Sequence, residues 1–289
     1  MTQPPRFAAV ITAAVIAVVF GVMLLLELRR PLRRSVESKA RRTVRNLTTG
    51  ATALAVAILL ETPLLVPISR WTMLHRAGLL NGVSMPAAVQ TVLSILLLDY
   101  TLWFWHYANH RVPFLWRFHL VHHVDRDMDT STALRFHFGE HALSMLYRAA
   151  QIVILGATPF AVWTWQVILF ASILFHHSNL ELPIAWERRL VRFVVTPRMH
   201  GVHHSDQLSE TNSNWSSLFS CWDYLHRTIL LAVPQNEVTI GVPAYRTASD
   251  VTIGRILLLP FVRQRSDFHL SDGRISNRSH EDVRTSLAD

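Results

Sequence analysis

Histidines in three short sets give the strongest chemical signal in this chain of 289 residues. Positions i, i+3 and i+4 lie on one face of a helix, so each set can present its imidazoles together. Of the 16 histidines, 12 lie between residues 106 and 204, which makes chance clustering a weak explanation. The sets follow H-x-x-x-H, H-x-x-H-H and H-x-x-H-H, and they comprise His106, His110, His119, His122, His123, His200, His203 and His204.

Eight converging imidazoles are too many for one metal ion, because a structural zinc ion is satisfied by four ligands. The number of histidines therefore predicts two metals in an all-nitrogen shell. Imidazole favours iron, zinc, copper or nickel over magnesium or calcium. Because zinc does not change its oxidation state, so large a histidine shell indicates a redox-active pair.

Two further histidine pairs lie near these sets. His137 and His141 are separated by four residues, so they can form another ligand pair, or they can support the site or face solvent. We take His137 as a candidate ligand and leave His141 open. His176 and His177 are neighbours that point about 100° apart on a helix, so only one of them easily faces a metal.

Asp99 is the one acid in the apolar stretch 87–105, and it precedes His106 by seven residues. An acid inside a membrane is costly unless it has a partner. Two helical turns back from His106, its carboxylate can accept the second imidazole N–H and fix which nitrogen faces the metal. We favour this role over the alternative, which is an ion pair with an arginine elsewhere in the bundle.

The apolar residues come in runs long enough to cross a bilayer, at about 20 residues per crossing. Half of the residues are hydrophobic, and the mean hydropathy is +0.24. The runs cover residues 7–28, 48–68, 87–105 and 152–175. The last run, with residues 142–150, predicts one long span or a re-entrant hairpin kinked at Pro159. We predict an all-α fold, an integral membrane bundle of about four spans with a histidine-rich helical cap that holds two metals.

The charge distribution predicts the orientation of this bundle. The loop between the second and third spans carries only Arg70 and Arg76, so the positive-inside rule makes the first loop cytoplasmic. The third span then brings the histidines, and with them the active site and the C-terminus, to the cytoplasmic side. The net charge is +8, and basic residues flank the spans, which favours anionic lipid headgroups over nucleic acid as the partner. The first loop carries Arg29, Arg30, Arg33, Arg34, Lys39, Arg41, Arg42 and Arg45.

Three regions follow from this reading. Residues 1–86 form an N-terminal membrane region with two spans, residues 87–232 form the catalytic domain, and residues 233–289 form a cytoplasmic C-terminal segment. The polar tail from residue 264 is expected to be a mobile end. The single cysteine, Cys221, excludes an intrachain disulfide and a cysteine-ligated iron–sulfur cluster within this chain. No dinucleotide or nucleotide motif is present.

Several motifs together resemble the fatty acid hydroxylase/sterol desaturase superfamily of membrane di-iron enzymes. The resemblance covers roughly residues 98–228 and rests on L-W-R-F-H-L-V-H-H, R-F-H-x-x-E, H-S-N, T-P-R-M-H-G-V-H-H-S, T-N-S-N and W-D. It implies His177, in H-S-N, as a further ligand. It also implies Glu140, Asn179 and Asp223, beside Asp99, as catalytic residues.

Two positions depart from the pattern of the superfamily. Tyr107 stands where an arginine usually follows the first histidine, and this puts an arginine-dependent contact near the metals in doubt. Phe138 stands where a proline usually follows the R-x-H histidine, and this change can alter the loop that approaches substrate.

The resemblance implies two iron ions that activate dioxygen to attack an unactivated C–H bond of a lipid. The product is an alcohol or an alkene, and the substrate is a fatty acyl, sterol-like or isoprenoid lipid that enters from the bilayer. Reduction would come from an external cytochrome b5-, ferredoxin- or reductase-like donor. The alternative function is a membrane metal-ion transporter or binding protein that uses the same histidines, and such a protein would carry more carboxylates in its spans.

Overall fold

The structure is a computed structural model that describes residues 4, 6–270 and 272–278. Helices are the regular elements of this part of the chain, which has isolated β-bridges but no strand. This result confirms the predicted all-α class.

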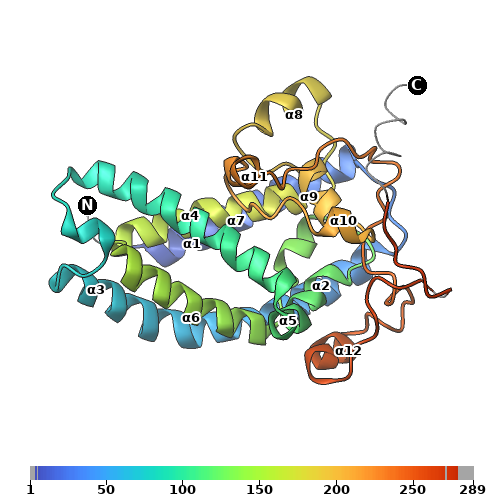
Figure 1. The fold of residues 1–289 in the computed structure, drawn as a ribbon, viewed down its shortest axis with the longest axis horizontal. Helices are drawn as coiled ribbons and strands as arrows, with labels where there is room; N and C mark the ends of the chain where they lie inside the picture. The colour runs from blue at the N-terminus through green and yellow to red at the C-terminus, as the bar shows by residue number, and fades with distance from the viewer. Residues whose placement is uncertain (1–3, 5, 271, 279–289) are drawn as a thin grey trace.

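Long helices form a bundle along the longest axis of the molecule (Figure 1). Four segments are long and apolar enough to cross a membrane, by length and composition, as predicted: Ala8–Arg29, Lys39–Gly82, Ala87–Arg111 and Pro159–His177. The helices are α1 (Ala8–Arg29), α2 (Lys39–Leu60), the π-helical turn η1 (Glu61–Leu65), α3 (Val66–Leu74), α4 (Ala87–Arg111), α6 (Phe138–Leu155) and α7 (Pro159–His177).

The predicted 142–175 region forms two helices, α6 and α7, that turn back on each other. Gly156 ends α6 in a left-handed conformation, with φ 72°. The Thr158 hydroxyl then caps α7 by accepting from the N–H of Ala161. Pro159 begins α7 rather than kinking a longer span, because proline suits the first turn of a helix. The prediction of a single long span is therefore wrong. The chain instead reverses its direction between α6 and α7, as in the hairpin alternative.

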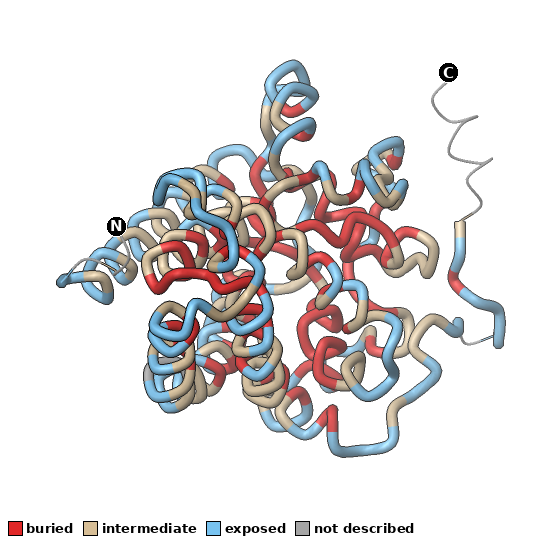
Figure 2. Tube along the Cα trace, turned by 60° about the vertical axis from the view of Figure 1, so that its left-hand side comes forward, coloured by how far each residue is buried: buried red, intermediate tan, exposed pale blue. Residues whose placement is uncertain are grey.

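Short helices gather at one end of the bundle and form a cap. Most buried residues lie in this cap, whereas the long helices are largely exposed or half-buried (Figure 2). The short elements at the cap end are α5 (Pro113–His123), η3 (Thr130–Leu134), α8 (Ile184–Leu190), α9 (Pro197–His203), α10 (Leu208–Thr211), α11 (Cys221–His226), α12 (Ile253–Leu258) and η4 (Leu259–Phe261). The turn η2 (Leu79–Gly82) lies at the opposite end of the bundle.

An ionic network ties the start of α2 to the loop after α5. Arg42 is fully buried and lies 2.9 Å from Asp125 and 2.8 Å from Asp129. Arg45 pairs with Glu37 at 2.8 Å and with Asp125 at 3.2 Å. Burial alone would raise the pKa of Asp125, but the facing arginines hold it well below its ordinary value. Arg42 and Arg45 are thus internal rather than available to lipid headgroups. Arg29, Arg30, Arg34 and Arg41 remain exposed.

Candidate metal centre

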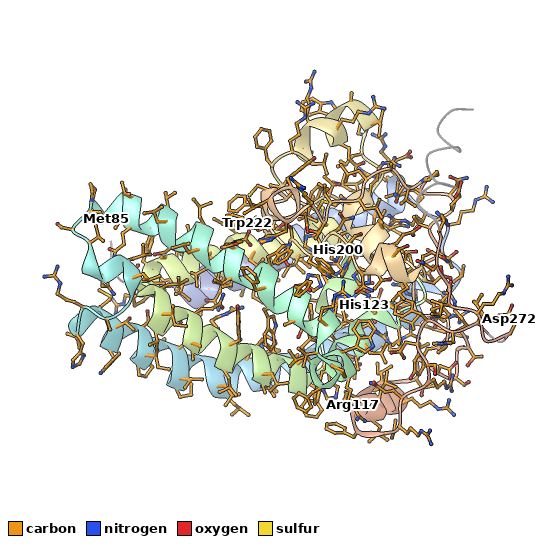
Figure 3. All side chains as sticks on the ribbon, viewed as in Figure 1. Met85, Arg117, His123, His200, Trp222 and Asp272 are labelled. Carbon is orange, nitrogen blue, oxygen red and sulfur yellow. The ribbon has the colours of Figure 1, made fainter. Side chains whose placement is uncertain are left out.

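Nine histidines converge at the cap end in two groups, as Figure 3 indicates for His123 and His200. Within each group, one candidate ligand atom per residue lies within 4.8 Å of the others. The five-histidine group comprises His106, His110, His119, His123 and His203. The four-histidine group comprises His122, His177, His200 and His204. The structure thus brings together all eight residues of the three sets and adds His177.

Each H-x-x-H-H set contributes to both groups. On α5, His119 and His123 belong to the five-histidine group and His122 to the other. On α9, only His203 belongs to the five-histidine group, whereas His200 and the C-cap residue His204 belong to the four-histidine group. Neighbouring helical positions point about 100° apart, so one short helix supplies both groups. Thr196 is the N-cap of α9 and Pro197 is its first residue.

The four-histidine group has the nitrogen spacing that a shared metal requires. The Nε2 atom of His177 lies 3.0 Å from the Nε2 atoms of His122 and His200. The Nε2 atom of His204 lies 3.1 Å from that of His200. Two nitrogens bound at right angles to one ion, each at about 2.1 Å, are roughly 3.0 Å apart. The four imidazoles therefore fit a single metal ion.

The five-histidine group fits a second ion on similar grounds. The Nε2 atoms of His119 and His123 lie 3.2 Å apart. Among the described residues, the buried Nε2 atoms of His110 and His203 have no hydrogen-bond partner. A buried polar atom without a partner is costly, and a bound metal ion would satisfy both atoms.

Hydrogen bonds to backbone carbonyls orient four of the imidazoles. A carbonyl only accepts, so the Nδ1 atom that contacts it carries the hydrogen and Nε2 keeps its lone pair. Burial also lowers the pKa of His203 to about 3, which keeps its ring neutral at neutral pH. The Nδ1 contacts are His106 to Trp215 O at 2.7 Å, His203 to Ser213 O at 2.8 Å, His177 to Ile173 O at 2.9 Å and His122 to Arg135 O at 3.3 Å.

Glu140 orients a fifth imidazole, that of His119. Its Oε1 atom lies 2.7 Å from His119 Nδ1, and both side chains are buried. A carboxylate in this position fixes the tautomer and raises the basicity of the ligand. Glu140 therefore lies beside the predicted site and would act on a bound metal through His119.

Asp223 organises the loop that supplies two of the carbonyls. Its fully buried carboxylate accepts from Trp215 N at 3.0 Å, Ser216 N at 2.9 Å and Trp103 Nε1 at 3.0 Å. The same loop carries the Trp215 carbonyl that accepts from His106. Asp223 is thus a positioning residue that lies outside both histidine groups.

Asn214 was not among the predicted residues, yet it shapes this same loop. Its φ of 54° lies in the left-handed region, which asparagine tolerates better than most residues. Its side-chain amide donates to Met199 O at 2.9 Å and to Leu230 O at 2.8 Å and accepts from Leu230 N at 2.8 Å. Asn214 lies between Ser213 and Trp215, whose carbonyls accept hydrogen bonds from His203 and His106. The T-N-S-N motif, which ends at Asn214, is the feature of the sequence that indicates this structural role.

Asp99 does not contact His106, so the predicted role as its carboxylate partner is corrected. Its Oδ2 atom accepts from Trp222 Nε1 at 2.7 Å and from Phe219 N at 3.1 Å. The alternative, an ion pair with an arginine, is not formed among the described residues either. Asp99 instead ties α4 to α11, and His106 contacts the Trp215 carbonyl.

His137 and Asn179 also lie outside the two groups. His137 caps α6: Nδ1 accepts from Gly139 N at 2.9 Å, and Nε2 lies 3.1 Å from Leu257 O. Both ring nitrogens are therefore engaged with backbone, which does not fit the predicted ligand. Asn179 exchanges hydrogen bonds of 2.9 and 2.8 Å with the backbone of Arg33, so it holds the α1–α2 loop rather than a reacting group.

His176 and His141 are likewise outside both groups. The His176 ring packs against His200, with 4.2 Å between the ring centroids, while its neighbour His177 faces the four-histidine group. The preference for His177 over His176 thus agrees with the placement of the two rings.

A cavity of about 180 Å³ reaches His110 between α5, α10 and the C-terminal segment. Trp116 lines it, with its ring centroid 5.0 Å from that of His110. The Trp116 indole N–H donates to Asp267 at 2.6 Å, and burial raises the pKa of Asp267 to about 6. Asp267 belongs to the polar tail, and Arg278 in the same tail pairs with Glu210 at 3.3 Å. The described residues of this tail are therefore packed against the cap. Residue 271 and residues 279–289 of the expected mobile end lie outside the part of the chain that the structure describes.

Comparison with known proteins agrees with this geometry. Residues 91–228 match the sequence profile of the fatty acid hydroxylase family. The chain is 28% identical over 197 residues to an ornithine lipid hydroxylase of Rhizobium tropici, covering 68% of this chain and 58% of that protein. It is 29% identical over 181 residues to the cholesterol 25-hydroxylase of Mus musculus, covering 59% of each chain.

A third relative is the alkylglycerol monooxygenase of Xenopus tropicalis, 26% identical over 147 residues that cover 50% of this chain and 31% of that protein. The chain thus spans less than two thirds of the length of these relatives. No solved structure matches this chain. Residues 91–228 and their histidine motifs thus match the fatty acid hydroxylase family, and the three relatives are members of the same superfamily.

Proposed function

We propose that this protein is an oxygen-dependent oxidoreductase that hydroxylates or desaturates a C–H bond of a membrane lipid at a histidine-ligated di-iron centre. The observation that carries the proposal is the convergence of nine imidazoles in two adjacent groups, each with the spacing of a single metal site. The relatives named above are hydroxylases and a monooxygenase that act on lipids, which supports the same class of reaction here.

The two groups would each hold one iron ion. Bound iron would supply the reductive activation of dioxygen needed to break an unactivated C–H bond. Hydroxylation consumes one dioxygen, two electrons and two protons, and it releases one water with the alcohol. Desaturation consumes the same reagents and releases two waters with the alkene. The electrons would come from an external cytochrome b5-, ferredoxin- or reductase-like protein.

The residues around the metals have distinct tasks in this reaction. The carbonyls of the 213–215 loop and the Glu140 carboxylate would hold the imidazoles in the ligating tautomer. Dense burial of the cap would keep bulk water from the oxidising centre. The cavity that His110 and Asp267 line would give protons a path to the five-histidine group.

The orientation is part of the proposal. The end of α1 and the loop to α2 lie at the same end of the bundle as the histidines (Figures 1 and 3), and they carry the exposed Arg29, Arg30 and Arg34. The positive-inside rule then favours the cytoplasmic side for the metals and the C-terminal segment. A lipid would enter from the bilayer, and a soluble donor would approach from the cytosol.

A metal-ion transporter or binding protein remains the alternative function. Transport needs a path of ligands across the membrane, whereas the described candidate metal groups all lie at one end of the bundle. This placement favours a resident metal centre.

Mass spectrometry of membrane lipids tests the proposal directly. Lipid extracts of cells that express the protein are compared with extracts of cells that express a His200→Ala, His203→Ala variant. We expect a lipid that gains 16 mass units or loses 2 in the first extract only. Identical lipid profiles, with an active electron donor present, would contradict the proposed reaction.

A further inference from the structure

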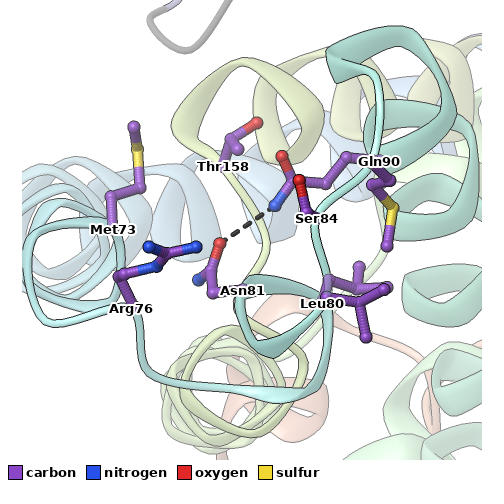
Figure 4. A pocket seen from close by; sticks show the side chains of 9 residues that line it. Met73, Arg76, Leu80, Asn81, Ser84, Gln90 and Thr158 are labelled. Carbon is purple, nitrogen blue, oxygen red and sulfur yellow. Dashed lines mark hydrogen bonds between the residues drawn. The ribbon is translucent and has the colours of Figure 1, made fainter.

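A polar cavity lies at the end of the bundle opposite the histidines. It has a volume of about 250 Å³ and lies between the end of α3, the η2 turn, the start of α4 and the turn between α6 and α7. Figure 4 shows the polar side chains that line it, and Figure 3 places Met85, another lining residue, far from His123 and His200. About 16 residues of α4 separate Gln90 from His106, which corresponds to roughly 24 Å. The cavity is therefore separate from the metal centre.

Arg76 directs a free guanidinium group toward this cavity (Figure 4). Among the described residues its side chain has no ion-pair or hydrogen-bond partner. The backbone of Arg76 has φ 49°, in the left-handed region that costs energy for most residues other than glycine. A guanidinium offers five N–H donors in a planar fork, and here the protein satisfies none of them.

The rest of the cavity is built before any ligand binds. The Asn81 amide donates to Ala77 O at 2.7 Å and to Gly156 O at 3.1 Å, and it accepts from Gln90 at 2.9 Å. A Cβ atom on Gly78 would lie 2.3 Å from the Gly156 nitrogen, so the loop presses against the α6–α7 turn. This close packing fixes the wall of the cavity and leaves Arg76 to meet a ligand.

The chemistry of the lining selects an anion. The Arg76 guanidinium and the hydroxyls of Ser84 and Thr158 supply donors, and no carboxylate lines the cavity. Arginine forks bind phosphate with two parallel hydrogen bonds. The volume lies below the range of about 300–1,000 Å³ that holds a whole drug-sized ligand, so it suits a headgroup.

The surroundings select a lipid as the source of that anion. Leu74, Leu79 and Val83 around the loop are 81%, 66% and 60% exposed, although they are apolar. Trp71 and His75 stack at 4.9 Å beside them, as aromatic residues do at the level of lipid headgroups. We propose that this cavity binds the phosphate of a phospholipid headgroup in the leaflet opposite the metal centre. The inference does not depend on the proposed reaction.

Lipid-dependent thermal unfolding of the full chain in a neutral detergent tests this site. Dioleoylphosphatidylglycerol should raise the unfolding temperature, whereas dioleoylglycerol, which lacks the phosphate, should not. Arg76→Gln should weaken the lipid affinity by about 10–100-fold, the loss expected for hydrogen bonds to a charged group. Arg70→Gln is the matched control, because Arg70 is exposed like Arg76 but lies on α3 outside the cavity.

Three results would overturn the proposal. Equal losses in Arg76→Gln and Arg70→Gln would mean general attraction of charges to the lipid surface. A stabilisation by dioleoylglycerol equal to that by the phospholipid would mean that the phosphate is not recognised. Stabilisation by inorganic phosphate without lipid would mean a site for a free anion. Arg76→Gly is a second variant that separates loss of lipid binding from misfolding, because glycine adopts φ 49° without strain. It should keep the unfolding temperature of the lipid-free protein and lose the rise that the phospholipid causes.

Discussion

Replacing Glu140 by glutamine tests how much the negative charge of Glu140 contributes to metal binding through the imidazole of His119. The glutamine oxygen can still accept from His119 Nδ1, 2.7 Å away in the native protein, so the size and the hydrogen bond are kept. The negative charge is lost. A hydrogen bond to a charged group contributes about 1.5–3 kcal/mol and a neutral one about 0.5–1.5 kcal/mol. The midpoints of these ranges differ by about 1.3 kcal/mol, which corresponds to roughly a tenfold loss of metal affinity.

Competition with a graded chelator measures this loss. Wild-type and variant proteins, both loaded with iron, are equilibrated with the chelator, and retained iron is counted per chain. Asp99→Asn is the matched control, because it also turns a buried carboxylate into an amide but contacts Trp222 and Phe219 rather than a histidine. We expect Glu140→Gln to release iron at a chelator concentration about tenfold lower than wild type does. Asp99→Asn should release iron at the same concentration as wild type. Equal behaviour of Glu140→Gln and wild type, or equal weakening in the control, would refute this reasoning.

Three further perturbations follow from the described contacts. His200→Ala should lower bound metal, whereas His137→Ala, which lies outside both groups, should not, and metal analysis of the two purified variants checks this. Asn214→Ala removes three side-chain hydrogen bonds and forces alanine to φ 54°, so we expect a loss of about 3 kcal/mol in unfolding free energy, measured by thermal unfolding. The pKa of His203 is lowered by burial to about 3 from 6.5, so the unfolded chain takes up the proton first as pH falls. Metal-free protein should therefore lose stability progressively from about pH 6.5 toward pH 3 in denaturant unfolding, and a flat profile would contradict this burial.

The sequence was sufficient to predict the spans and the histidine sets because both depend on local patterns. Long apolar runs indicate membrane helices whatever lies beside them. Helical spacing likewise brings His119, His122 and His123 together before any tertiary contact forms. The division of each H-x-x-H-H set between two metal groups was not predicted, because it depends on how α5 and α9 face each other.

Partners distant in the sequence were the main source of error. Asp99 faces residues about 120 positions later, at Phe219 and Trp222, and its distance of seven residues from His106 gave no sign of this. Arg42 belonged to a basic cluster typical of a lipid-facing loop, yet the acidic loop after α5 covers it. Such pairings are decided by the packing of the cap, which no local pattern in the sequence records.

The metal content of the purified protein tests the central claim most directly. Full-length protein prepared in detergent from iron-replete cells is analysed for iron, zinc, copper and nickel per chain. The two histidine groups predict about two iron ions per chain, with both lost in a variant that carries His200→Ala and His203→Ala. Protein that is folded but holds zinc in place of iron, or only one ion per chain, would contradict the di-iron centre.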